Sequence, residues 1–221
     1  MSAQTLPVAD NPTSSRKLMR LAGAFYLVII LAGVGGELAL RAPLLSAAAP
    51  APAIAANLAQ FRASLGADII MILADIGLAL AFFTLLRPVS ETAARAALVF
   101  RLMQAAMITV GVIFLAAVPA LITAGEPALA LQLAGQHAIA YDTGLIFFGV
   151  NSMIMAWLLC HGTQAPTLLN AGIGLSGIVY VAGGLTRLLA PELVHVLQPA
   201  YLLPLVAESW LCLWLLFTRK A

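Results

Sequence analysis

The chain has 221 residues, of which 62% are hydrophobic and only 9% are charged, and its mean hydropathy is +1.02. A soluble domain of this length needs far more charge to cover its surface, so the composition indicates an integral membrane protein whose main solvent is lipid. The formal net charge of +2, without any basic run, argues against a nucleic-acid partner.

The first 15 residues are rich in Ser, Thr, Pro and Asp, and we expect them to form a disordered tail. Residues 16–221 then form a single transmembrane helical domain. A bilayer core of about 30 Å needs about 20 apolar residues per helix. Six stretches meet this requirement and predict an all-α integral membrane protein, a six-helix transmembrane bundle: Leu18–Leu40, Leu65–Leu86, Ala96–Val118, Ala138–Cys160, Thr167–Leu188 and Pro199–Thr218.

The positions of Lys and Arg predict how the bundle is oriented. If the N-terminus is cytoplasmic, the inner side collects Arg16, Lys17, Arg20, Arg87, Arg95, Arg219 and Lys220, and the outer side collects Arg41, Arg62 and Arg187. Basic residues accumulate on the cytoplasmic side of membrane proteins. This excess therefore predicts that both the N- and the C-terminus are cytoplasmic.

Two loops on the predicted outer side are long enough to form short interfacial helices. Residues 53–62, AIAANLAQFR, and residues 128–137, ALALQLAGQH, are rich in Ala and Leu with a thin polar face. The second stretch follows Pro127, and proline favours the first turn of a helix. We interpret both as short helices at the membrane surface, which act as interfacial filler or as lids.

Polar side chains recur at matching depths in the predicted spans. At about 1.5 Å per residue, an outer tier lies within about 6 Å of the hydrocarbon edge, and a second tier lies near the middle. The outer tier holds Glu37, Asp68 and Asp142, with His137 at the edge, and the middle tier holds Tyr26, Asp75, Gln104, Asn151 and Glu208. Arg101 starts nearer the cytoplasmic edge, and its long side chain can reach the middle tier or extend to the cytoplasm.

Helical spacing places these groups on shared faces. Asp68 and Asp75 are seven residues apart, and Arg101 and Gln104 are three apart, so each pair lies on one side of its helix. An ionisable group that faces lipid costs a few kcal/mol or more. We therefore expect these faces to turn inward and line a polar, acid-lined cavity, with seven ligand-binding or cavity residues: Tyr26, Glu37, Asp68, Arg101, Gln104, Asp142 and Asn151.

The two deep acids, Asp75 and Glu208, are the candidate catalytic residues. A buried carboxylic acid that carries a proton can act as a general acid or as a proton carrier. It can also be an inert hydrogen-bond donor that holds helices together. No metal site is expected, because His137 and Asp142 are spaced poorly for two ligands on one helix and no HxxxH or CxxC pattern occurs.

The remaining features point to packing. Cys160 and Cys212 fall near predicted cytoplasmic ends of spans, so we expect reduced thiols that serve as small buried hydrophobic groups. The fifth span is rich in glycine, which permits close approach of neighbouring helices. Its glycines are Gly172, Gly174, Gly177, Gly183 and Gly184.

Five stretches carry a family resemblance in chain order. They are RLAGAFYLVIILAGVGGELALR at 20–41, ADIGLALAFFTLLRPV at 74–89, FRLMQAA at 100–106, GLIFFGVNSMIMAWLL at 144–159 and ESWLCLWLL at 208–216. Together they resemble the bacterial multi-pass membrane family catalogued as domain of unknown function 4386. The resemblance implies a small protein of the bacterial inner membrane without an established activity. It places Arg20, Glu37, Asp75, Arg101, Gln104 and Glu208 at family motif positions.

Three functions fit these patterns. An apolar bundle with a few convergent polar groups and no catalytic motif is typical of a site for a lipid-like or isoprenoid-like small molecule. The alternatives are an intramembrane acid-catalysed enzyme, similar in architecture to terpene cyclases, and a proton-coupled transporter, which the lack of an internal repeat disfavours. We expect no cofactor. The expected partners are the lipid bilayer and an apolar ligand, and an oligomer is compatible with the sequence.

Overall fold

The computed structural model describes residues 12–218 of the chain. In that range every regular element is a helix, and six segments are long and apolar enough to cross a membrane: Ser15–Leu45, Leu58–Leu86, Glu91–Thr123, Pro127–Gly162, Thr167–Leu189 and Pro191–Phe217. The predicted all-α bundle of six transmembrane helices is therefore confirmed. The first helix begins at Pro12, inside the predicted tail, whereas residues 1–11 and the predicted inner cations Arg219 and Lys220 lie outside the described residues.

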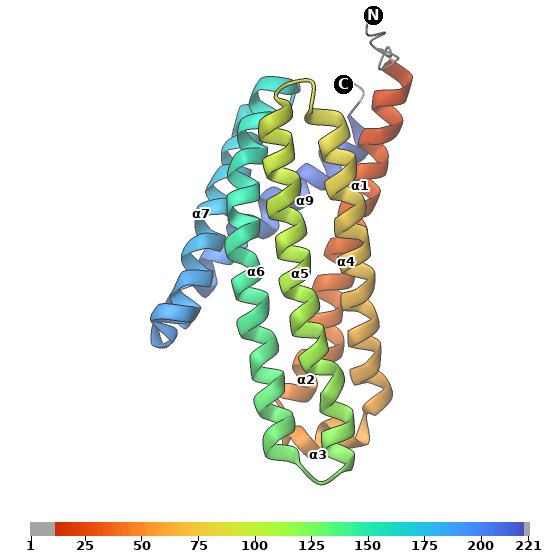
Figure 1. Ribbon diagram of the computed structural model, residues 1–221, viewed down its shortest axis with the longest axis vertical. Coiled ribbons are helices and arrows are strands. Elements are labelled where there is room, and N and C mark those ends of the chain that lie inside the picture. Colours follow the sequence, from red (N-terminus) through yellow and green to blue (C-terminus); the bar gives the residue numbers. More distant parts are fainter. Residues whose placement is uncertain (1–11, 219–221) are drawn as a thin grey trace, which may run out of the picture.

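The long helices form a closed ring. In chain order the elements are α1 (Pro12–Gly35), the π-helix η1 (Gly36–Arg41), α2 (Ala42–Leu45), α3 (Pro50–Ala56), α4 (Leu58–Leu86), α5 (Glu91–Thr123), α6 (Pro127–Gly162), α7 (Thr167–Leu189), the 3-10 helix η2 (Pro191–Leu193), α8 (Val194–Leu197), the 3-10 helix η3 (Gln198–Tyr201) and α9 (Leu202–Phe217). Each long helix packs against the next, and α9 returns to α1 (Figure 1). The start of α1 and the end of α9 lie at one end of the ring, the terminal end, and α2 and α3 lie at the other, the α2–α3 end (Figure 1).

Helices α5 and α6 are longer than the third and fourth predicted spans. Their 33 and 36 residues extend about 50 Å, beyond the hydrocarbon core of about 30 Å. Residues 128–137 are the first turns of α6, so the predicted separate interfacial helix is wrong. Pro127 starts the helix and nothing after it interrupts the backbone, while the turn before it is made at Gly125, whose φ is +80°.

A short helix does form near the predicted one at 53–62, but its bounds differ. The chain breaks at Asn57, which separates α3 from the start of α4. Ile54 on α3 and Phe61 on α4 are both 0% exposed, because they pack into a small apolar core with the ends of α5 and α6. This core closes the α2–α3 end of the ring. Short helix α3 is therefore held in place by side-chain packing at this end of the ring.

A larger apolar core fills the terminal end of the ring. It joins buried residues of α1, α4, α5, α6, α7 and α9, including Tyr26, Leu78, Leu158 and Leu211. Cys212 belongs to this core, and its Sγ donates to the carbonyl oxygen of Gly23 at 3.5 Å. Cys160 is an exposed free thiol on the outside of α6, so the prediction that it is buried is wrong.

Helices α6 and α7 approach each other closely at two glycines. A Cβ atom built on Gly149 would lie 2.5 Å from the carbonyl oxygen of Gly177, and the reverse distance is also 2.5 Å. Only glycine allows the two backbones to approach so closely. The glycine-rich fifth span was predicted to pack closely, and this contact confirms it.

Candidate functional site

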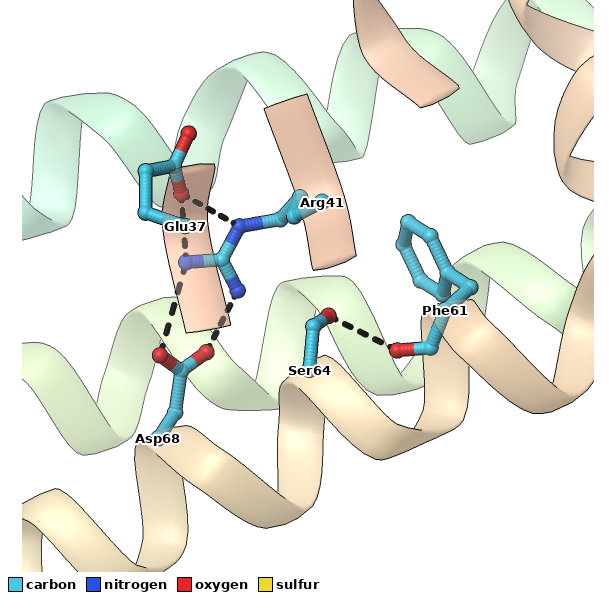
Figure 2. Close-up of polar contacts among 5 residues, drawn as sticks. All are labelled: Glu37, Arg41, Phe61, Ser64 and Asp68. Atoms are coloured by element: carbon cyan, nitrogen blue, oxygen red, sulfur yellow. Dashed lines mark hydrogen bonds and ion pairs between the residues drawn. The ribbon is translucent and has the colours of Figure 1, made fainter. Parts of the chain in front are cut away.

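The first buried polar group has Arg41 at its centre. Its Nη1 and Nη2 donate to the two carboxylate oxygens of Asp68 at 2.5 and 3.4 Å, and its Nε donates to Oε2 of Glu37 at 2.7 Å (Figure 2). Arg41 and Asp68 are buried, whereas the side chain of Glu37 is 46% exposed. A guanidinium that meets a carboxylate through two nitrogens forms a strong and directional pair. The three side chains therefore tie η1 to α4.

The π-helix η1 explains why Arg41 lies inside the protein. The sequence predicts that the first span ends at Leu40 and that Arg41 is a cation of the outer loop, which is wrong. The helix continues through η1 into α2, and the four-residue spacing puts Glu37 and Arg41 on one side, facing α4. A π-helical turn inside an α-helix is rare and is often found at functional sites.

The second buried group is the pair of Arg101 and Asp75. The Nε and Nη2 atoms of Arg101 both donate to Oδ1 of Asp75, at 2.9 and 2.6 Å. Both residues are buried. The guanidinium carbon lies 5.0, 5.6 and 5.8 Å from the ring centres of Phe148, Tyr26 and Phe82, respectively. Arg101 thus points to the middle of the bundle and not to the edge that the sequence predicts to be cytoplasmic, and aromatic faces surround its charge.

Several buried polar atoms in the described residues lack a hydrogen-bond partner within the protein. They include Oδ2 of Asp75, Oε1 of Gln104 and both amide atoms of Asn151. Arg101 and Asn151 also border a hollow of about 10 Å³. That volume is about what one water molecule needs. This part of the middle tier is therefore a packed polar core and has no room for an organic ligand.

Glu208 is the centre of the third group. The hydroxyl of Tyr180 donates to Oε1 of Glu208 at 2.5 Å, and Tyr26 interacts with the same carboxylate. The ring of Tyr180 is 5.2 Å from that of Phe148 and 5.9 Å from that of Tyr201, measured between centres. Among residues 12–218, no ion pair joins Glu208 to a cation. Glu208 is thus held by phenols, unlike the other intramembrane acids.

A pocket of about 530 Å³ connects the first and third groups. Its charged and polar lining consists of Glu37, Arg41, Asp68, His137, Tyr141, Asp142, Tyr180, Arg187, Tyr201 and Glu208, and its apolar lining includes Ile29, Ile30, Val34, Leu38, Met71, Ala134, Ala138 and Leu205. Nε of Arg187 donates to Oδ2 of Asp142 at 2.5 Å across the α6–α7 side. A second hollow of about 190 Å³ shares Asp142, Arg187 and Tyr201 with the pocket.

The pocket lies where α1 and α9 diverge. The two helices touch at the terminal end, at Gly23 and Cys212, and α9 then runs obliquely toward the far end of α7 (Figure 1). Toward the α2–α3 end, the pocket separates the two helices. It is bordered there by Val34 of α1, Leu38 of η1 and Leu205 of α9. These three side chains are 42%, 66% and 47% exposed, so they form an apolar part of the rim on the outside of the ring, beside the 46% exposed side chain of Glu37.

The nine predicted site residues fall in two places. Four of them line the pocket, namely Glu37, Asp68, Asp142 and Glu208, and five do not, namely Tyr26, Asp75, Arg101, Gln104 and Asn151. Sequence reasoning missed Arg41, Tyr180, Arg187 and Tyr201 as pocket residues. A usable pattern existed for two of them, because Tyr180 and Arg187 are seven residues apart and share a face of α7.

Comparisons with known proteins identify a family without an assigned activity. The model of a family described as Domain of unknown function (DUF4386) matches residues 21–218. No curated protein and no solved structure matches the chain significantly. Within the described residues, no three His, Cys, Asp or Glu side chains are grouped so that they could hold a metal ion.

Proposed function

The chain belongs to the family of domain of unknown function 4386, and we propose that it binds a lipid-like or isoprenoid-like small molecule in the pocket between α1, α6, α7 and α9. The observation that carries this proposal is the pocket itself. Its volume of about 530 Å³ lies within the range of about 300–1,000 Å³ that is usual for small-molecule sites. Apolar walls and a few convergent polar groups are the usual composition of such sites.

The apolar rim supports entry of the ligand from the bilayer. Val34, Leu38 and Leu205 expose their side chains where α1 and α9 separate, so an apolar molecule can enter the pocket along these three side chains. The polar groups of the pocket lie in two places, around Glu208 and around Arg41. A molecule with one polar end and an apolar body matches this distribution.

An acid-catalysed enzyme is the second candidate, and one observation favours it. The carboxyl group of Glu208 lines the pocket and pairs with no cation, so it is placed to meet a ligand. Asp75 accepts two hydrogen bonds from Arg101 and does not line the pocket. In an enzymatic mechanism Glu208 would be the proton donor and Asp75 a structural residue.

We also propose that the protein lies in the bacterial inner membrane with both termini in the cytoplasm. Six membrane-crossing helices return the chain to the side from which it started. The excess of Lys and Arg at that side supports the cytoplasmic assignment. The α2–α3 end of the ring, with the Arg41 group, then lies toward the outer side.

The proposal is tested by filling the pocket and identifying what purifies with the protein. Ala138 lines the pocket, whereas Ala106 is exposed on the outside of α5 and borders none of the described hollows. We expect mass spectrometry of organic extracts to find a compound enriched in the wild type and in Ala106→Phe, and reduced at least about fivefold in Ala138→Phe. Equal, unselective lipid in all three proteins would refute ligand binding in this pocket.

A further inference from the structure

The charged groups that line the pocket do not balance. Four carboxyl groups face it, against two guanidinium groups. Arg41 is shared between Glu37 and Asp68, and Arg187 pairs with Asp142. Glu208 is left without a cationic partner among the described residues. The nearby charge of Arg101 acts on Glu208, but its hydrogen bonds go to Asp75. In a low-dielectric site, unbalanced carboxylates favour a ligand that brings positive charge.

The groups around Glu208 suit a cationic head group. Tyr180, Tyr201 and Tyr141 all line the pocket, and the first two rings lie 5.9 Å apart. Aromatic faces attract a substituted ammonium, and removal of water strengthens that attraction. A carboxylate beside tyrosine rings is therefore the chemistry that recognises an alkylated nitrogen.

An anionic ligand fits the same pocket less well. All three guanidinium nitrogens of Arg41 already contact Glu37 or Asp68. Arg187 has its Nε committed to Asp142, so an anion near it would face that carboxylate. The four lining carboxyl groups would repel a negative charge anywhere in the pocket.

We propose that the ligand is a lipophilic cation, a hydrophobic amine or quaternary ammonium compound. Its positive head lies beside Glu208 and the tyrosine rings, and its apolar body follows Ile29, Ile30 and Leu205 toward the bilayer. This inference rests on the proposed function and adds the charge of the ligand to it.

The test uses three fluorescent rods with the same diphenylhexatriene body. One is neutral, one carries a trimethylammonium group and one carries a propionate group. Energy transfer from the three tryptophans of the protein, in an uncharged detergent, reports binding. We expect the cationic rod to bind at least about tenfold more tightly than the neutral rod, and the anionic rod most weakly.

Glu208→Gln should remove this preference by lowering the affinity for the cationic rod to that for the neutral rod. Unchanged affinity for the neutral rod shows that the variant is folded and its pocket intact. The matched control is Glu91→Gln, at an exposed carboxylate of the first turn of α5, and it should leave all three affinities unchanged.

The outcomes separate the two proposals. Equal or tighter binding of the neutral or anionic rod, or a preference that survives Glu208→Gln, would overturn the cationic assignment while the pocket remains a binding site. Binding that is not saturable for any rod, or that ignores Ala138→Phe, would overturn the proposed function and this inference with it.

Discussion

Buried ion pairs are the most distinctive single-residue feature of this membrane protein. Arg41 and Asp68 have side chains that are only 3% and 2% exposed, so each charge depends on its partner more than a surface charge does. We expect Arg41→Leu to lower the free energy of unfolding by about 3–5 kcal/mol, because it leaves the Asp68 carboxylate buried and unpaired. The measurement is thermal or denaturant unfolding of purified protein in detergent.

The double variant makes this prediction specific. Arg41→Leu with Asp68→Leu should be more stable than Arg41→Leu alone, because the carboxylate that it still leaves without a cation, Glu37, is 46% exposed and not buried. The control is Arg95→Leu, which breaks the pair with Glu91 on the surface of α5, where both side chains are about two-thirds exposed. Exposed pairs contribute about 0–1 kcal/mol. Additive losses in the double variant would contradict the assigned pairing of Arg41 with Asp68.

Asp75 and Glu208 show which part of the site could be predicted from the sequence. Both were identified as deep acids because apolar runs of known length fix their depth. The depth of a residue does not show whether its side chain lines the pocket or pairs with a neighbouring helix. Only the packing of α4 against α5 shows that Asp75 forms an ion pair with Arg101. Arg41 was misplaced for a related reason, because hydropathy cannot detect that a π-helix carries the chain on past Leu40.

The close contact between helices α6 and α7 depends on glycine. At the crossing of α6 and α7, a Cβ on Gly177 would meet the carbonyl oxygen of Gly149 at 2.5 Å and Cγ of Met153 at 2.7 Å. We expect Gly177→Ala to lower the free energy of unfolding by about 1–3 kcal/mol, because the backbone oxygen cannot move aside. Helix α7 carries Tyr180 and Arg187, so the pocket should lose ligand as well.

Gly135 provides the control for this prediction. It lies on α6, and an added Cβ there would meet nothing within 4 Å. Gly135→Ala should therefore be neutral or slightly stabilising, since alanine is the better helix former. Unfolding curves of both variants and the wild type give the comparison. A Gly177→Ala protein as stable as Gly135→Ala would show that α6 and α7 do not cross so closely.

At the scale of elements, apolar length predicted six helices but not their true ends. The criterion of about 20 apolar residues reports the part of a helix that crosses lipid. It does not report how far α5 and α6 continue beyond it, because that depends on contacts with α2, α3 and α4 around Ile54 and Phe61. Those contacts join residues that are far apart in sequence, so a local pattern in residues 53–62 or 128–137 could not reveal them.

The whole molecule combines two ends of different character. The terminal end is closed by a large apolar core that includes the contact between α1 and α9. Toward the α2–α3 end the same two helices separate and border the pocket. The pocket therefore lies nearer the α2–α3 end of the ring. The leaflet from which a ligand reaches it depends on which side of the membrane this end faces.

The orientation can be tested with single cysteines in a background in which Cys160 and Cys212 are replaced by serine. Ala124 is exposed in the turn between α5 and α6, at the α2–α3 end, and Gln164 is exposed between α6 and α7, at the terminal end. We expect a membrane-impermeant maleimide to label Ala124→Cys in intact spheroplasts and Gln164→Cys only after lysis, because positive residues favour a cytoplasmic terminal end. The reverse pattern would place the pocket nearer the cytoplasmic leaflet, and a ligand that comes from the bilayer would then enter from that leaflet.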